Sequence, residues 1–230
     1  MLILALDTTG SARSCALARD GVLVREEAGD ATHPQATRLP GELAALLDRE
    51  RVGLGDIDAF AVGVGPGSFT GMRVGIATMQ GLAVATDRPL FGVSALDALA
   101  YRAGLFESQR SAAGLRVAAW VDAWRGEVYA ALYEPGRGPA PTSASPGRLL
   151  DELRDRPTLF TGGGAAVYQE TIRAALGPSA RFTDPIVPLL AGAMAQMAAG
   201  HFRAGHRPAP DAVRPLYVRR SDAELTRDRT

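Results

Sequence analysis

The chain has 230 residues, of which 47% are hydrophobic and 22% charged, and this composition is typical of a globular protein of one or two domains. Its 25 basic residues are all arginines and balance 25 acidic residues, so the chain has no overall positive field that would hold nucleic acid. The lack of lysine excludes mechanisms that need a lysine amine, among them the Walker phosphate loop and Schiff-base catalysis.

The cysteine content and the start of the chain predict the cellular compartment, and the histidine spacing bears on metal binding. The single cysteine, Cys15, has no partner for an internal disulfide, which is typical of a reducing compartment. The apolar start of the chain lacks a basic region and reaches Asp7 too soon for a signal peptide. His33, His201 and His206 do not have the spacing of metal ligands, so we expect no metal site. We therefore expect a cytoplasmic protein that does not enter a membrane.

The first hundred residues alternate between extended and helical patterns. Asp20-Gly21 predicts a hairpin, Pro40 is expected to begin or kink the first helix, and Ser94 is expected to cap the third. The predicted strands are 2–6, 14–18, 22–26, 57–64 and 90–93, and the predicted helices are around 39–47, 72–83 and 95–103. Because antiparallel strands lead into parallel crossovers, residues 1–106 are predicted to form a mixed α/β lobe.

Residues 107–230 are predicted to form a second, less regular α/β lobe, which begins with a polar segment. An apolar strand at 115–121 ends at Asp122 and is followed by a turn and a strand at 128–133. This layout echoes the start of the chain and indicates two related halves. A strand at 158–161 and helices at 165–176 and about 188–204 complete the second lobe.

Two strand-ending aspartates with hairpins after them, and a later glycine-rich turn, are typical of the two-lobed actin/sugar-kinase/Hsp70 superfold, which is RNase H-like. In that layout the aspartates hold magnesium through water and the glycine turn contacts the adenosine of a nucleotide. The residues in those places are Asp7, Thr8, Thr9, Asp122, Gly162 and Gly163. Trp124 opposes nucleotide binding, because a bulky indole stands where a phosphate needs small residues. A strand that ends in aspartate is also common in proteins without such a site.

The densest motif is the glycine-rich turn Gly65–Gly71. Its spacing fits neither a dinucleotide fingerprint nor the nucleophile elbow of a hydrolase around Ser68. The following helix contains Gly75 and Gly81, each of which destabilises a helix by about 1 kcal/mol relative to alanine. We therefore expect a close approach along this helix, either by the protein's own sheet or first helix or by a partner protein.

Together these motifs resemble the TsaB family, also called YeaZ, which takes part in the synthesis of threonylcarbamoyladenosine in bacterial tRNA. The similarity covers nearly the whole chain, and the glycine block is its most specific part. It rests on residues 4–9, His33 with Leu39-Pro40, the block 63–75, residues 121–129 and residues 215–219.

The resemblance implies a noncatalytic subunit that activates the enzyme TsaD by forming a heterodimer. TsaD transfers a threonylcarbamoyl group to N6 of the adenosine next to the anticodon, and it carries a His-x-x-x-His metal pair. The matching stretch here, 93–99, has no histidine, so loss of catalysis is expected. The ATPase TsaE is a further implied partner, and the chain alone could form a homodimer. ATP or ADP with magnesium, and tRNA, are expected only at the level of the complex.

The resemblance also implies that the first two helices form the partner interface. Gly75→Leu and Ile76→Glu are accordingly predicted to disrupt partner binding and to leave the fold largely intact. The competing hypotheses are an independent nucleotide-binding enzyme that uses Asp7 and Asp122, and a metallopeptidase-like protein of the same superfold. The residues expected at the interface are His33, Leu39, Leu43, Leu46, Leu47, Gly71, Met72, Arg73, Gly75, Ile76 and Met79.

Overall fold

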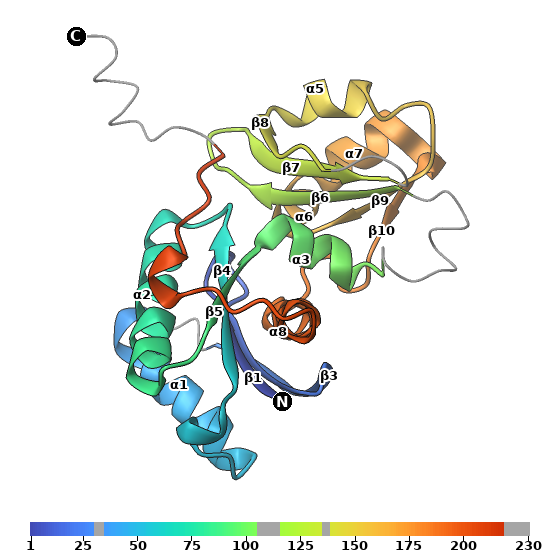
Figure 1. Ribbon diagram of the computed structural model, residues 1–230. Coiled ribbons are helices and arrows are strands. Elements are labelled where there is room, and N and C mark those ends of the chain that lie inside the picture. The colour runs from blue at the N-terminus through green and yellow to red at the C-terminus, as the bar shows by residue number, and fades with distance from the viewer. Residues whose placement is uncertain (30–34, 105–115, 135–138, 219–230) are drawn as a thin grey trace, which may run out of the picture.

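The computed structural model describes residues 1–29, 35–104, 116–134 and 139–218, which form two lobes with a five-stranded sheet in each (Figure 1). The first sheet has the order β3-β2-β1-β4-β5, and the second has the order β10-β9-β6-β7-β8. The strands of the first sheet are β1 (Leu2–Asp7), β2 (Ser14–Arg19), β3 (Val22–Ala28), β4 (Ala59–Gly65) and β5 (Leu90–Ser94). Those of the second are β6 (Arg116–Asp122), β7 (Val128–Tyr133), β8 (Thr142–Ala144), β9 (Thr158–Thr161) and β10 (Ala180–Phe182).

Both sheets are built in the same way. Strand β1 pairs antiparallel with β2 and parallel with β4, while β2 pairs antiparallel with β3 and β4 pairs parallel with β5. Strand β6 stands in the same relation to β7 and β9, which pair in turn with β8 and β10. The two related halves predicted from the aspartate-ended strands are therefore confirmed. This duplicated layout is the actin/sugar-kinase/Hsp70 fold.

Helices and sheets alternate in layers (Figure 1). Helices α1 (Gln35–Arg49) and α2 (Phe69–Thr86) cover one face of the first sheet. Helices α3 (Ala95–Arg102) and α8 (Ala191–Arg203) lie between the two sheets. The far face of the second sheet carries α5 (Pro146–Asp151), α6 (Gly163–Val167) and α7 (Gln169–Leu176). No described helix has the length and apolar character that a membrane crossing requires.

Strand β1 shows why the first sheet lies at the centre of its lobe. All six of its residues are buried, because helices cover both faces of the sheet. Leu4 and Leu6 face the core under α1 and α2, while Ile3 and Ala5 face the core shared with α8. Small side chains on the α8 side, such as Ala5 and Ala16, allow this alanine-rich helix to approach the sheet closely.

The second half of the chain departs from the predicted boundaries in two places. The single helix expected at 165–176 is divided at Tyr168, whose φ of −103° and ψ of 21° leave the helical region. Helix α8 falls within the predicted second lobe along the sequence, yet it packs against β1, β2 and β4 of the first sheet. The ranges 1–106 and 107–230 stay a prediction of the domain boundary. Pro40 lies inside α1, which begins at Gln35.

Candidate functional site

The strand-ending aspartates of the two sheets meet at one cleft between the lobes. Asp7 ends β1, Asp122 ends β6, and both line a cavity of about 420 Å³. Thr9, Gly162 and Gly163 line the same cavity. The structure thus brings together five of the six residues predicted from the nucleotide-binding layout. Thr8, the sixth, does not line this cavity.

Each aspartate holds the turn that follows its strand. One Asp7 carboxylate oxygen, Oδ1, accepts hydrogen bonds from the backbone N–H of Thr9 at 2.9 Å and from the Thr9 hydroxyl at 2.6 Å. In the second lobe, Asp122 Oδ1 accepts from the backbone N–H of Trp124 at 3.0 Å. A side chain that bonds the backbone two residues on is the usual role of aspartate in turns. The duplicated aspartates therefore have a structural role that needs no ligand.

The described lining of the cleft carries two carboxyl groups, those of Asp7 and Asp122, and no positively charged side chain. No Arg, Lys or His is among the described residues that line it, so none of these residues offers a positive charge to a polyphosphate. Burial raises the pKa of Asp7 above its usual value. The described residues also contain no group of three or more His, Cys, Asp or Glu side chains placed to hold a metal ion. Trp124, 56% exposed, stands at the same cleft.

The environment of Asp7 predicts a pH-dependent effect of Asp7→Asn. Because the folded-state pKa is raised, the carboxyl group stabilises the fold most below the unfolded-state pKa of about 3.8, and this contribution is lost as the pH rises through the folded pKa. Asparagine keeps the acceptor oxygen and carries no charge. The free energy of unfolding of the variant is expected to rise relative to that of the parent chain between about pH 4 and pH 8. Urea unfolding at both pH values measures this, and an equal difference at both would contradict it.

Most residues predicted for the partner interface lie inside the protein's own core. Arg73 is exposed on α2, and His33 lies outside the described residues. The buried members are not accessible to a partner in this conformation, so the interface stays a prediction that needs other contact residues. These buried side chains are Leu39, Leu43, Leu46 and Leu47 of α1 and Met72, Ile76 and Met79 of α2.

The close approach expected beside Gly75 is made within the chain. A Cβ atom at Gly75 would lie 2.2 Å from Thr8 Oγ1, and the Thr8 hydroxyl donates a hydrogen bond of 2.8 Å to the carbonyl oxygen of Gly71. Gly71 and Gly75 thus allow α2 to pack directly against the turn after β1. The structure therefore corrects the expectation that Gly75→Leu would leave the fold intact. Ile76→Glu would likewise place a carboxylate in the core under α2.

The outer face of α2 carries exposed apolar residues that the sequence analysis did not assign. Phe69 and Val84 are 46% and 66% exposed. The guanidinium carbon of Arg73 lies 3.9 Å from the centroid of the Phe69 ring, and Arg73 Nε donates to the Tyr217 hydroxyl at 3.2 Å. The sequence signal for this surface was the presence of apolar residues outside the buried stripe of α2. The contact between Arg73 and Tyr217 could not be predicted from local spacing, because the two residues are more than 140 positions apart in the chain.

The fold and the cleft define a two-lobed protein of the actin-like class with a cavity between its lobes. The model of the family described as TsaD, tRNA N6-adenosine threonylcarbamoyltransferase, matches residues 29–224. The tRNA threonylcarbamoyladenosine biosynthesis protein TsaB of Bacillus subtilis (strain 168) is 30% identical over 184 residues, which cover 77% of each chain. A solved structure of YeaZ from Pseudomonas aeruginosa has 32% identity and a TM-score of 0.75, and the match covers 94% of this chain and 99% of that one.

The protein named TsaB in Escherichia coli (strain K12) is 42% identical over 135 residues. That match covers 58% of this chain and spans only 55% of the relative's length. With the family model and the Bacillus relative, it shows that the chain belongs to the TsaB (YeaZ) family, within the wider family that includes TsaD.

Proposed function

We propose that this chain is a noncatalytic subunit of tRNA threonylcarbamoyladenosine synthesis that pairs with TsaD and activates it. The observation that carries the proposal is the 30% to 42% identity with proteins named for this biosynthesis, joined to a full-length structural match with YeaZ. In this proposal TsaD transfers the threonylcarbamoyl group to N6 of the adenosine next to the anticodon, and this chain provides a docking surface.

The cleft supports a noncatalytic role. Its two aspartates already hold their own turns, and no described side chain there supplies the positive charge that phosphoryl chemistry needs. The stretch 93–99, which joins β5 to α3, has no histidine to hold a catalytic metal. ATP or ADP with magnesium therefore acts at the level of the complex, where TsaE is the proposed third partner. A second copy of this chain is the proposed occupant of the same surface when TsaD is absent. We place the protein in the cytoplasm in this proposal.

The proposed docking surface is the outer face of α2. Phe69, Arg73, Ala77 and Val84 recur at spacings of four, four and seven residues, which places them along one side of the helix. All four are exposed, and two of them are large apolar side chains. Exposed apolar side chains that share one face are typical of protein interfaces.

An in vitro modification assay tests the proposal. It contains unmodified tRNA, threonine, bicarbonate, ATP and the other synthesis proteins, and it is run with and without this chain. Modified nucleoside is expected only when the chain is present, and the chain alone is expected to produce none. Equal modification without the chain would overturn the proposed role. ATP turnover by the isolated chain would overturn the noncatalytic assignment and favour the independent enzyme.

A further inference from the structure

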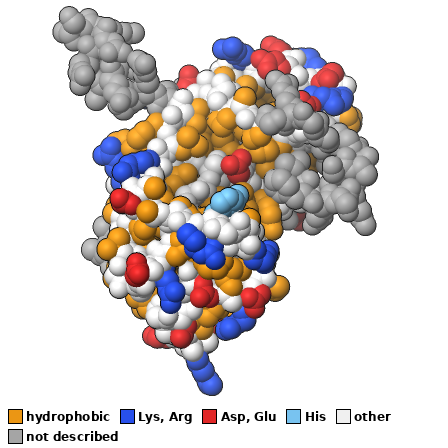
Figure 2. Space-filling model, viewed as in Figure 1, with side chains coloured by type: hydrophobic (Ala, Val, Ile, Leu, Met, Phe, Trp, Pro, Cys, Tyr) orange, Lys and Arg blue, Asp and Glu red, His pale blue; other side chains and the backbone are white. Residues whose placement is uncertain are grey.

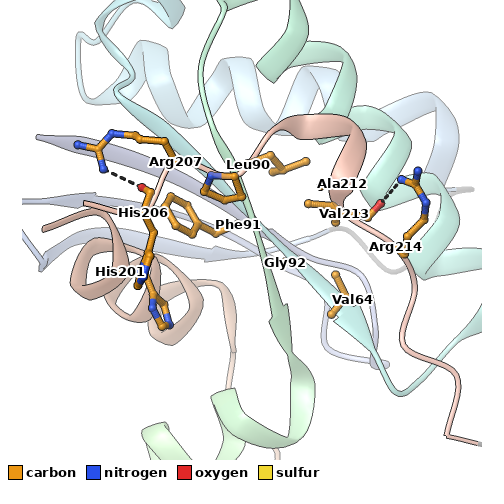
Figure 3. Close-up of a pocket in the computed structure, with 11 residues that line it drawn as sticks. Val64, Leu90, Phe91, Gly92, His201, His206, Arg207, Ala212, Val213 and Arg214 are labelled. Carbon is orange, nitrogen blue, oxygen red and sulfur yellow. Dashed lines mark hydrogen bonds between the residues drawn. The ribbon is translucent and has the colours of Figure 1, made fainter. Parts of the chain in front are cut away.

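A second cavity, of about 660 Å³, opens beside β5 and shares no described residue with the interlobe cleft (Figure 3). We call it the β5 pocket. Its walls come from β5, from the end of α8 and from the chain that follows α8. The residues that matter for its chemistry are Phe91, His201, His206, Arg207, Val213 and Arg214.

The path of the chain after α8 creates this pocket. Strand β5 is an edge of the first sheet, and the returning chain is hydrogen-bonded once to β5 and once to its neighbour β4. The Leu90 N–H donates to the carbonyl oxygen of Pro208 at 3.2 Å, and the Leu216 N–H donates to that of Val64 at 2.7 Å. Between these two hydrogen bonds the side chains of Val213 and Val64 both lie close to Gly92, which adds no side chain of its own. The result is a hollow with an apolar floor.

Two arginines flank that floor, at opposite ends of the pocket in Figure 3. Arg207 Nη1 donates to the carbonyl oxygens of Phe202 and His206, both at 2.7 Å, and its guanidinium lies 3.4 Å over the Phe202 ring. Arg214 Nη1 donates to the carbonyl oxygens of Asp211 and Val213. These bonds orient both guanidinium groups, and their acceptors are uncharged backbone carbonyl oxygens. In the described part of the chain neither arginine forms a salt bridge, and no described Asp or Glu lines the pocket.

Aromatic rings occupy the same side as Arg207. The rings of His201 and His206 have centroids 5.5 Å apart, and His201 stacks on Phe91 with an interplanar angle of 18°. Both histidines are exposed, and Figure 2 shows a histidine beside arginine side chains on this face. Oriented cations next to planar rings and an apolar floor are the combination that holds single-stranded nucleic acid, since phosphates bind the cations and bases stack on the rings.

We propose that the β5 pocket binds a single-stranded stretch of RNA, with its phosphates on Arg207 and Arg214 and a base against His201 and the apolar floor. The proposal rests on the proposed function, which brings this chain to a tRNA. An acidic peptide would meet the same cations but has no planar group for the rings. The contact is local and salt-sensitive, in keeping with a chain of formal net charge +0.

Fluorescence anisotropy tests the proposal on the full chain, with a labelled single-stranded oligoribonucleotide and a labelled unmodified tRNA as probes. The test variant is Arg207→Gln with Arg214→Gln. The control is Arg148→Gln with Arg181→Gln, which removes two exposed arginines of the second lobe and the same charge. We expect the test variant to bind both probes about tenfold more weakly at about 50 mM salt. The slope of the logarithm of its association constant against the logarithm of the salt concentration is expected to become shallower by about one unit or more. The control should match the parent chain in both affinity and slope.

Equal binding by the test variant and the control would overturn the proposal. Competition experiments distinguish RNA from other anionic ligands. If inorganic phosphate displaced the labelled oligoribonucleotide at a concentration similar to that of unlabelled oligoribonucleotide, the pocket would be reassigned to a free anion. Displacement by poly-glutamate would reassign it to an acidic protein. This test measures binding, so its result is independent of the modification assay. If the chain bound RNA through these arginines but was dispensable for modification, the proposed function would be refuted and the RNA-binding pocket would stand.

Discussion

Gly75→Leu is expected to lower the free energy of unfolding by about 3 kcal/mol or more, and to leave too little folded protein for partner binding to be measured. The reason is the contact with the turn after β1, where a Cβ atom at position 75 would lie 2.2 Å from Thr8 Oγ1. A leucine there must push α2 away from the turn and break the bond from Thr8 to Gly71. Urea unfolding followed by circular dichroism measures the loss.

Gly81→Leu in the same helix is the matched control. Gly81 is exposed, and a Cβ atom there would meet nothing within 4 Å. Leucine is the better helix former, so this variant is expected to be as stable as the parent chain or more stable by up to about 1 kcal/mol. If both leucine variants unfolded at the same urea concentration, the contact between Gly75 and Thr8 would not be what makes position 75 intolerant.

These two glycines show where sequence reasoning about α2 ends. Both interrupt the same helical pattern, and both predict a close neighbour equally well. Only the structure shows that Gly75 meets Thr8 and that Gly81 faces open space. A glycine in a helix indicates that a neighbour can come close, but local spacing does not say whether that neighbour belongs to the same chain.

Long-range packing also limited the prediction of the lobes. The strands and helices of the first hundred residues followed from hydrophobic periodicity, and the duplicated aspartates predicted the interlobe cleft. Nothing near α8 in the sequence indicates that it packs against β1, because that contact joins residues more than 180 positions apart. The β5 pocket depends on the same return of the chain, so its histidines looked isolated in the sequence.

Val84→Asp is expected to weaken association with TsaD, the proposed partner, by about 100-fold. In the free chain Val84 is 66% exposed on α2, so a carboxylate there stays in water and the fold should change by no more than about 0.5 kcal/mol. In the proposed complex the same carboxylate would be buried without a partner of opposite charge, which is strongly unfavourable. Titration calorimetry with purified TsaD measures the affinity, and thermal unfolding of the free chain checks the fold.

Val22→Asp provides a control with the same change of chemistry at nearly the same exposure, since Val22 is 69% exposed. It lies on β3, at the opposite edge of the first sheet from β5, and outside the helix layer formed by α1 and α2. If α2 forms the interface, only Val84→Asp should lower the affinity for TsaD, and Val22→Asp should bind TsaD as tightly as the parent chain does. Equal affinities for all three proteins would remove α2 from the interface, and equal losses in both variants would indicate a general effect of added negative charge.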